Sequence, residues 1–279
     1  MRAYTYGMNA TGTRKRASIM ADIFYPEDAS AATAALESYD SEEQGAAVAI
    51  IAPHAGWDIS GRVTGSAFGA ASGRKVSTVV VIGPLHASRE EGLFLSDSEW
   101  FETPIGDIAV DLALCEELAT CGTSFVSNDI PHLEEHSIEI LLPFIKRAFP
   151  EAAIVPILIG GSRPSAVKAL SRSLDLVFGP LVDETLFIAS TNLSAHMKTA
   201  EANHHADEFL RLIRNMDGEG TLAALSAGKI SACGAAACAA LLGCRLLSGT
   251  NARVVSESSS DRKGGASEKL VRYAAVAFE

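Results

Sequence analysis

Two stretches of this chain share one design, and they constrain the fold more than any other feature. Each is an apolar run rich in Val and Ile that ends in a Pro and is followed within two residues by a His, at residues 46–54 and 77–86. A continuous apolar run of this length predicts a strand buried on both faces, as in a parallel sheet. Ligands of α/β proteins bind at the carboxyl edge of such sheets. We therefore expect His54 and His86 to meet at one edge, on strands that this pattern allows to be neighbours.

The rest of the chain continues the alternation of strand and helix. The other apolar runs that predict strands lie at residues 153–160, 185–190, 252–256 and 270–278. A helical segment at residues 164–178 separates the first two, which indicates parallel strands joined by a right-handed crossover. The last two predict an antiparallel hairpin around a polar loop at residues 257–268. We predict an α/β fold with a mixed, mostly parallel sheet flanked by helices, in a single domain over residues 1–279.

Composition narrows the classes of partner. The chain has 279 residues, 48% of them hydrophobic, which is enough for one sizeable core. A net charge of -11 argues against binding to nucleic acid or to an anionic lipid surface. The sequence has no apolar run that approaches the roughly 18 residues of a membrane span, and its first residues lack the apolar core of a secretory signal. We expect a cytoplasmic protein whose partner is a small molecule, a peptide or another protein.

The two strand-terminal histidines predict a metal ion. One His after a strand is most often a structural residue, but two in the same context favour a shared ligand, and neutral imidazole is the commonest metal ligand. Cys233 is a candidate third ligand, because Ser231 and the apolar run 235–247 predict a helix with Cys233 in its first turn. The helix dipole there favours the thiolate, which is the form of Cys that binds metals. The five cysteines show no paired spacing, so neither a disulfide framework nor a zinc ribbon is indicated.

Other polar and aromatic residues are candidates for the lining of this site. His136 and Glu139 lie three positions apart, hence on one face of a helix, and can supply catalytic groups or a surface pair. Asn192 and His196 follow the apolar run 185–190 and so belong to the same sheet edge. Trp57 follows the first His closely and is either a wall of the pocket or part of the core.

One motif suggests a different chemistry. The segment 131–149 has helical periodicity that Pro143 interrupts, and it contains His132-Leu-Glu-Glu-His136. This sequence satisfies the H-x-x-E-H pattern of inverted zinc peptidases, in which two histidines bind zinc and Glu135 acts as the base. Three specified positions among five are a weak signal. A zinc peptidase therefore remains a remote alternative.

Several motifs in order resemble the Memo family, whose bacterial and archaeal members are often named AmmeMemoRadiSam system protein B. They are Pro53-His54-Ala-Gly56, Gly83-Pro84-Leu-His86, Thr103-Pro-Ile-Gly106-Asp107, Glu135-His136-Ser-Ile-Glu139, Pro156-Ile-Leu-Ile-Gly160 and Cys233-Gly234. The resemblance runs over nearly the whole chain. It implies a fold similar to class III extradiol dioxygenases and a mononuclear iron or copper site, with zinc a possible occupant of a purified sample. It also implies that His54, His86 and Cys233 bind the metal and that His136 and Glu139 line or support the pocket.

The chain departs from the family pattern at one place. Members usually show Ser-Ser-Asp-x-x-His after the fifth strand, whereas this chain has Ser190-Thr-Asn192-Leu-Ser-Ala-His196. An amide carries no negative charge and cannot act as a base, which leaves the roles of Asn192 and His196 open. We predict a metal-dependent redox protein, an oxidoreductase of the dioxygenase type acting on a small molecule. The competing prediction is a non-catalytic module that binds a peptide or protein in the same pocket.

Overall fold

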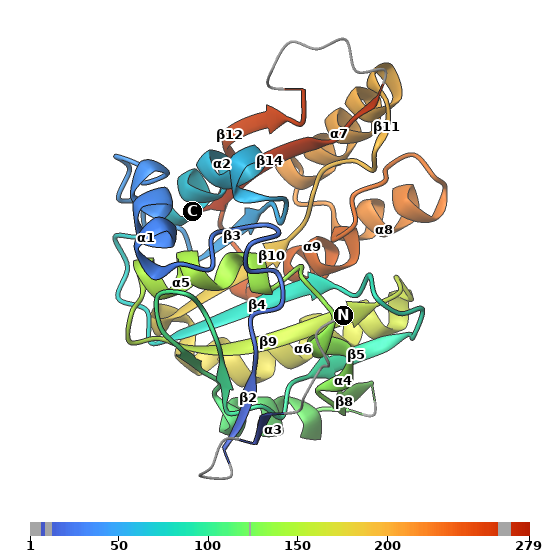
Figure 1. Cartoon of the computed structure of the whole chain (residues 1–279). Helices are drawn as coiled ribbons and strands as arrows, with labels where there is room; N and C mark the ends of the chain where they lie inside the picture. The colour runs from blue at the N-terminus through green and yellow to red at the C-terminus, as the bar shows by residue number, and fades with distance from the viewer. Residues whose placement is uncertain (1–6, 9–12, 123, 262–268) are drawn as a thin grey trace.

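Eight strands form the main sheet of the protein, seen in the computed structural model of Figure 1. In spatial order they are β12 (Ala252–Ser259), β14 (Arg272–Phe278), β3 (Ala49–Ala52), β10 (Thr185–Ser190), β4 (Thr78–Pro84), β9 (Ala153–Gly160), β5 (Gly92–Leu95) and β8 (Phe125–Ser127). The structure describes residues 7–8, 13–122, 124–261 and 269–279. The four central strands, from β3 to β9, are parallel, and β14 and β5 flank them in antiparallel pairing. The predicted mixed α/β sheet is confirmed.

The central strands are the apolar runs of the sequence. Every residue of β3, β4 and β10 is buried, as is all of β9 after its first residue. A strand buried on both faces needs no polar side chains, which explains why these runs do not alternate. The hairpin of β12 and β14 is antiparallel as predicted. Strand β12 extends to Ser259, so the polar loop begins later than predicted, and residues 262–268 of it lie outside the described residues.

Helices cover both faces of the sheet (Figure 1). They are α1 (Ala29–Ser38), α2 (Trp57–Gly69), α3 (Leu112–Thr120), α4 (Ile130–Leu133), α5 (Leu142–Ala148), α6 (Pro164–Phe178), α7 (Thr199–Arg214), α8 (Gly218–Ser226) and α9 (Ala235–Leu242). Helix α2 joins β3 to β4 and α6 joins β9 to β10, and these two connections run across the sheet in opposite directions. Right-handed crossovers in opposite directions place their helices on opposite faces. Helices α1 and α5 pack with α2, whereas α9 packs with α6.

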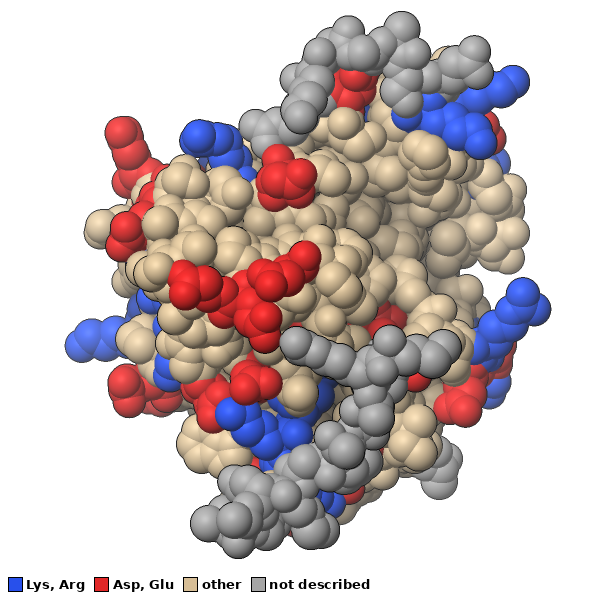
Figure 2. All heavy atoms as spheres, in the orientation of Figure 1, with Lys and Arg blue, Asp and Glu red and all other residues tan. Residues whose placement is uncertain are grey.

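Short elements complete the chain. They are β1 (Gly7–Met8), β2 (Arg14–Arg16), β6 (Trp100–Phe101), β7 (Ile108–Ala109), β11 (Met197–Lys198), β13 (Lys269–Leu270) and the 3-10 turns η1 (Glu139–Leu141), η2 (Gly179–Glu184) and η3 (Arg245–Leu247). Strands β1, β2, β6 and β7 form a second small sheet. Most of the buried apolar side chains of the described residues form one core cluster. Acidic side chains gather on the face seen in Figure 2, in line with the net charge of -11.

The segment 131–149 is not the interrupted helix that its periodicity predicts. It forms α4, a non-helical turn at residues 134–138, the 3-10 turn η1 and then α5. Within the turn, the Glu135 carboxylate accepts hydrogen bonds from the backbone N–H groups of His136 and Ser137. These side-chain bonds take the place of helical bonds. Pro143 lies in the first turn of α5, where its missing N–H is tolerated.

Cys233 also lies outside its predicted element. Helix α9 has Gly234 as its N-cap, so Cys233 precedes the helix instead of occupying its first turn. The N–H of Gly234 donates to Thr191 Oγ1 at 2.8 Å, which ties the start of α9 to the end of β10. Among the described residues, none of the helices has both the length and the apolar character needed to cross a membrane.

Candidate metal centre

The candidate site lies at the carboxyl edge of the parallel strands. His54 follows β3 by two residues and His86 follows β4 by two residues. These strands are not neighbours, because β10 lies between them and pairs with both. Ser190, the last residue of β10, is level with Ala52 of β3. The sequence pattern did not place β10 between β3 and β4. Because β10 lies there, the hydroxyl of Ser190 lies between the two histidines.

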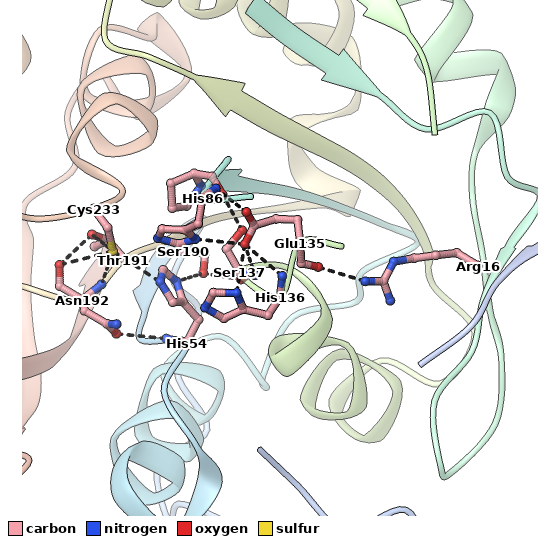
Figure 3. Close-up of polar contacts among 11 residues, drawn as sticks. Arg16, His54, His86, Glu135, His136, Ser137, Ser190, Thr191, Asn192 and Cys233 are labelled. Carbon is pink, nitrogen blue, oxygen red and sulfur yellow. Dashed lines mark hydrogen bonds and ion pairs between the residues drawn. The ribbon is translucent and has the colours of Figure 1, made fainter. Parts of the chain in front are cut away.

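Three imidazoles meet at this edge (Figure 3). His54, His86 and His136 each offer a ring nitrogen, and these atoms all lie within 4.8 Å of one another. The ring centroids are 5.3 Å apart for His54 and His86, 5.6 Å for His54 and His136 and 4.9 Å for His86 and His136. This spacing suits three nitrogen ligands around one small ion. The third histidine of the cluster is His136, which the sequence had suggested as a catalytic or supporting residue and not as a metal ligand.

The tautomer of His54 is fixed by Ser190. Ser190 Oγ donates its proton to the carbonyl of Ser137 at 2.6 Å, so it can only accept from Nδ1 of His54, which lies 2.7 Å away. A hydroxyl has one proton to donate, which forces the proton of His54 onto Nδ1. Nε2 of His54 is therefore the nitrogen that faces the other imidazoles and Cys233, whose Sγ lies 3.3 Å from it. The hydrogen bond at one ring nitrogen decides which nitrogen is free for a metal.

Glu135 organises the other two histidines. Its Oε1 lies 2.9 Å from Nδ1 of His86 and 3.3 Å from Nδ1 of His136. The same carboxylate accepts a bond from the backbone N–H of His86 and, as described above, from two N–H groups of its own turn. Its side chain is 1% exposed. A buried carboxylate behind a histidine is the arrangement that orients metal-binding imidazoles in many proteins, with Nε2 toward the ion.

The electrostatics of the cluster follow from these contacts. Burial alone would raise the pKa of Glu135, but its bonds to His86 lower it to about 2, so the group is a carboxylate. Burial would likewise lower the pKa of His86, but hydrogen bonds to Cys233 and Glu135 raise it to about 10. Burial and the neighbouring charge of His54 lower the pKa of His136 to about 4, which keeps this imidazole neutral. A metal that binds here displaces the proton of His86.

Cys233 lies beside the cluster. Its Sγ is 3.3 Å from Nε2 of His54 and accepts a bond from the backbone N–H of Asn192, also at 3.3 Å. Burial would raise the pKa of this thiol, but the charges and hydrogen bonds of His54 and His86 hold it well below its usual value. The two imidazoles therefore favour the thiolate.

Two glycines permit the close approaches in this site. A Cβ on Gly83, in β4, would lie 2.5 Å from Ser137 Oγ, so the turn that carries Glu135 and His136 could not pack against the strand. A Cβ on Gly234 would lie 2.1 Å from the carbonyl oxygen of Ser190. The glycines of the Gly-Pro and Cys-Gly motifs thus serve the packing of the site, because real Cβ contacts are never this short.

The remaining predicted residues lie elsewhere or have other contacts. Asn192 Oδ1 accepts a bond from the backbone N–H of His54 at 3.2 Å, which is a task that an amide performs as well as a carboxylate. Trp57 is 2% exposed and stacks against Tyr25, so it belongs to the core and is not a pocket wall. His196 is exposed in the loop between β10 and β11, away from the three-histidine cluster. Glu139 is buried, where it forms an ion pair with Arg16, and its carboxylate does not line the cluster.

The geometry contradicts the zinc-peptidase pattern. His132 belongs to α4, which ends at Leu133, so His132 and His136 do not lie one turn apart on a common helix. His132 is 2% exposed and its Nε2 lies 3.1 Å from the carbonyl oxygen of Phe94. Glu135 is occupied by His86 and by backbone donors, which leaves it no role as a base. Pro131 and the turn at 134–138 are the physical reasons, since together they prevent a continuous helix.

Sequence reasoning missed two residues of this site. Glu135 appeared only as the base of the peptidase pattern and as an unassigned member of a family motif, and Ser190 only as part of a motif that departs from its family. The position of Ser190 at the end of an apolar run was the one signal for it. Nothing in the spacing of Glu135 indicates that it contacts His86, which is 49 residues away.

The fold and this cluster define an α/β protein with a three-histidine candidate metal site at the edge of its sheet. A family model described as Memo-like protein matches residues 16–277. The chain belongs to the Memo family, as its motifs had suggested.

Curated relatives agree with this assignment. A MEMO1 family protein of Methanosarcina acetivorans is 32% identical over 233 residues, covering 82% of this chain and 85% of the relative. Another, from Caldivirga maquilingensis, is 28% identical and covers 83% of each chain. Among solved structures, an uncharacterized protein from Escherichia coli K12 matches with a TM-score of 0.46 at 13% identity, over 72% of this chain and 86% of that one.

Proposed function

We propose that this protein binds one iron or copper ion through His54, His86 and His136, with Cys233 beside it, and uses the ion in redox chemistry on a small molecule. The observation that supports this most directly is the state of the three Nδ1 atoms. Ser190 Oγ bonds to Nδ1 of His54 at 2.7 Å and Glu135 bonds to Nδ1 of His86 at 2.9 Å, and Glu135 Oε1 also lies 3.3 Å from Nδ1 of His136. The Nε2 atoms of His54 and His86 are thereby turned toward the place where a ring nitrogen of His136 also lies, so one ion can bind all three rings.

The donor set suits a catalytic ion better than a structural one. Structural zinc sites are closed by four protein ligands, whereas three imidazoles leave positions for other molecules. The side chains of His86 and His136 are 35% and 25% exposed, so solvent and small molecules reach the imidazoles. An iron or copper ion with open positions supplies a place where oxygen and a substrate bind side by side. We expect the substrate to be a small molecule.

The thiolate of Cys233 affects which metal the site prefers. Its thiolate lies 3.3 Å from Nε2 of His54, close enough to replace or join an imidazole around the ion. Soft thiolate ligands favour Cu(I) and zinc, whereas imidazole ligands also suit iron without a thiolate. A thiolate at a redox site is also open to oxidation. We therefore expect the Cys233→Ser variant to retain Fe(II) and to lose most of its affinity for Cu(I).

Metal analysis of the purified protein tests the proposal. Chain purified anaerobically is loaded with Fe(II) or Cu(I), freed of loose metal and measured for metal content and oxygen uptake. The matched variants are His54→Ala and His204→Ala, because His204 is exposed on α7 and lies outside the cluster. We expect about one ion per chain in the wild type and in His204→Ala, and almost none in His54→Ala.

Three results would contradict the proposal. Equal metal content in all three proteins would show that the cluster does not bind the ion. Zinc as the only metal retained, with no oxygen uptake after Fe(II) or Cu(I) loading, would exclude redox chemistry. Binding of a peptide that is unchanged after metal removal and in His54→Ala would favour a non-catalytic binding module.

A further inference from the structure

Arg16, the last residue of β2, is a buried charge that the metal cluster itself does not explain. Its side chain is 2% exposed, and its guanidinium lies over the ring of Phe101 at 5.5 Å from the ring centroid. A buried arginine is costly unless each of its donors has a partner. Its partners are therefore informative about what the residue does.

The guanidinium binds the turn that carries Glu135 and His136. Nε donates to the carbonyl of His132 at 2.8 Å, and Nη2 donates to the carbonyl of Glu135 at 2.9 Å. The second of these carbonyls belongs to the peptide bond that joins Glu135 to His136. One rigid group thus holds the end of α4 and the start of the turn at a fixed separation, and Figure 3 shows its bond to Glu135.

Glu139 locks the guanidinium in this position. Nη1 of Arg16 lies 2.7 Å from Oε2 of Glu139, which is 1% exposed. The other carboxylate oxygen of Glu139 accepts bonds from the hydroxyl of Tyr25 at 2.5 Å and from the backbone N–H of Met20 at 2.8 Å. Glu139, which the sequence had suggested as a residue of the pocket, therefore lies behind the pocket and contacts Arg16.

We propose that Arg16 is a positioning residue of the metal centre: it holds the turn at 134–138 in the one shape that presents Glu135 to His86 and places the ring of His136 beside His54. This inference rests on the proposed function, since it concerns the same site. The planar fork of a guanidinium is what the role needs, because two donors of fixed geometry must reach two carbonyls at once. A lysine keeps the charge next to Glu139 but offers a single point of attachment.

The test compares Arg16→Lys with a matched control, Arg74→Lys. Arg74 is half-buried and donates to the carbonyls of Thr185 at 2.8 Å and Val182 at 2.7 Å, at the opposite end of β10. Cobalt(II) titration of each protein reports metal affinity, and the absorption of the bound cobalt reports the geometry of its ligands. Hydrogen exchange of the metal-free proteins reports the order of the turn through the amides of His136 and Ser137.

We expect Arg16→Lys to bind cobalt about 10-fold more weakly or worse, with an altered absorption spectrum, as for other residues that orient metal ligands. The amides of His136 and Ser137 should exchange at least 10-fold faster in Arg16→Lys. Arg74→Lys should stay within threefold of the wild type in both measurements.

The inference is overturned if Arg16→Lys and Arg74→Lys change both measurements equally, since Arg16 would then act only on overall stability. If the wild type binds no cobalt, the proposed function fails, while the hydrogen exchange still decides the role of Arg16. If Arg16→Lys does not fold, Glu139→Gln replaces it, because the amide keeps an acceptor for Tyr25 and removes only the lock on Arg16. A loss of cobalt affinity and amide protection of more than threefold in Glu139→Gln supports the inference, and no loss contradicts it.

Discussion

The hydroxyl of Ser190 lies 2.7 Å from Nδ1 of His54, although the two residues are 136 positions apart in the chain. The contact exists because β10 is inserted between β3 and β4, so that the end of β10 falls between two histidines. A second bond, from Ser190 Oγ to the carbonyl of Ser137, joins the same residue to the turn that carries His136. One serine therefore contacts two of the three segments that form the cluster.

Loss of this hydroxyl should weaken metal binding more than it weakens the fold. In Ser190→Ala, Nδ1 of His54 loses its acceptor, so the ring proton can move to Nε2, the nitrogen that is to bind the metal. We expect metal affinity to fall by about 10-fold and the free energy of unfolding to fall by about 1 kcal/mol. Competition titration and urea denaturation measure the two quantities.

Ser171→Ala is the control for this prediction. Ser171 is also buried and donates to a backbone carbonyl, that of Ala240, at 2.7 Å in the α6 and α9 contact. It should lose similar stability and no metal affinity. Unchanged affinity in Ser190→Ala would show that the hydroxyl does not set the tautomer of His54.

Among the residues that do not bind the metal themselves, Glu135 should have the largest effect on metal affinity. Glu135→Gln keeps the size of the side chain but replaces one carboxylate oxygen with an NH2 group. That group cannot accept the N–H hydrogen bonds that the oxygen accepts in the wild type. We expect a 10- to 100-fold loss of metal affinity and about 2 kcal/mol of lost stability from the unsatisfied donors. The neighbouring Glu134 is exposed, so Glu134→Gln should change neither quantity. Equal affinities of the two variants would refute the orienting role of Glu135.

A methyl group at Gly83 should separate the turn from the strand. In Gly83→Ala the added Cβ meets Ser137 Oγ at 2.5 Å and Ile138 at 2.9 Å, so the turn must move. We expect a loss of about 2 kcal/mol in the free energy of unfolding, together with weaker metal binding. In Gly179→Ala the Cβ meets nothing within 4 Å, and the backbone there is right-handed helical. Thermal denaturation of the two variants should differ clearly, and equal melting temperatures would contradict the prediction.

Acid should destabilise the fold through His132. Burial lowers the pKa of this imidazole from 6.5 to about 4. Between these two values the unfolded chain binds a proton that the folded chain does not, so the free energy of unfolding falls as the pH is lowered. The shift corresponds to about 3 kcal/mol lost between pH 6.5 and pH 4.

The variant His132→Gln isolates this effect, because an amide can donate to the carbonyl of Phe94 and does not titrate in this range. His136 also has a pKa of about 4, so both proteins lose stability in acid. The loss should be smaller in His132→Gln by about 3 kcal/mol. Parallel stability curves for the two proteins would show that the buried state of His132 has no part in acid unfolding.

Local pattern alone determined a large part of the architecture. The central strands could be predicted because a strand buried on both faces needs an unbroken run of apolar side chains, which is visible without any partner. Helix α6 was predicted with its observed bounds of 164–178 because its apolar positions recur at helical spacing and a Pro begins it. The placement of His54 and His86 at one sheet edge followed from the direction shared by parallel strands.

The tertiary structure alone decided which groups face the histidines. Strand order is set by packing of the helices on the sheet, and no local pattern states that β10 lies between β3 and β4. The turn at 134–138 replaces the helix that the periodicity predicts, because the carboxylate of Glu135 bonds to the backbone of its own turn and to His86, and because Arg16 binds the carbonyls of His132 and Glu135. The sequence thus determined that two imidazoles reach one edge, while contacts between segments far apart in the chain determined the third imidazole, its orientation and the carboxylate behind it.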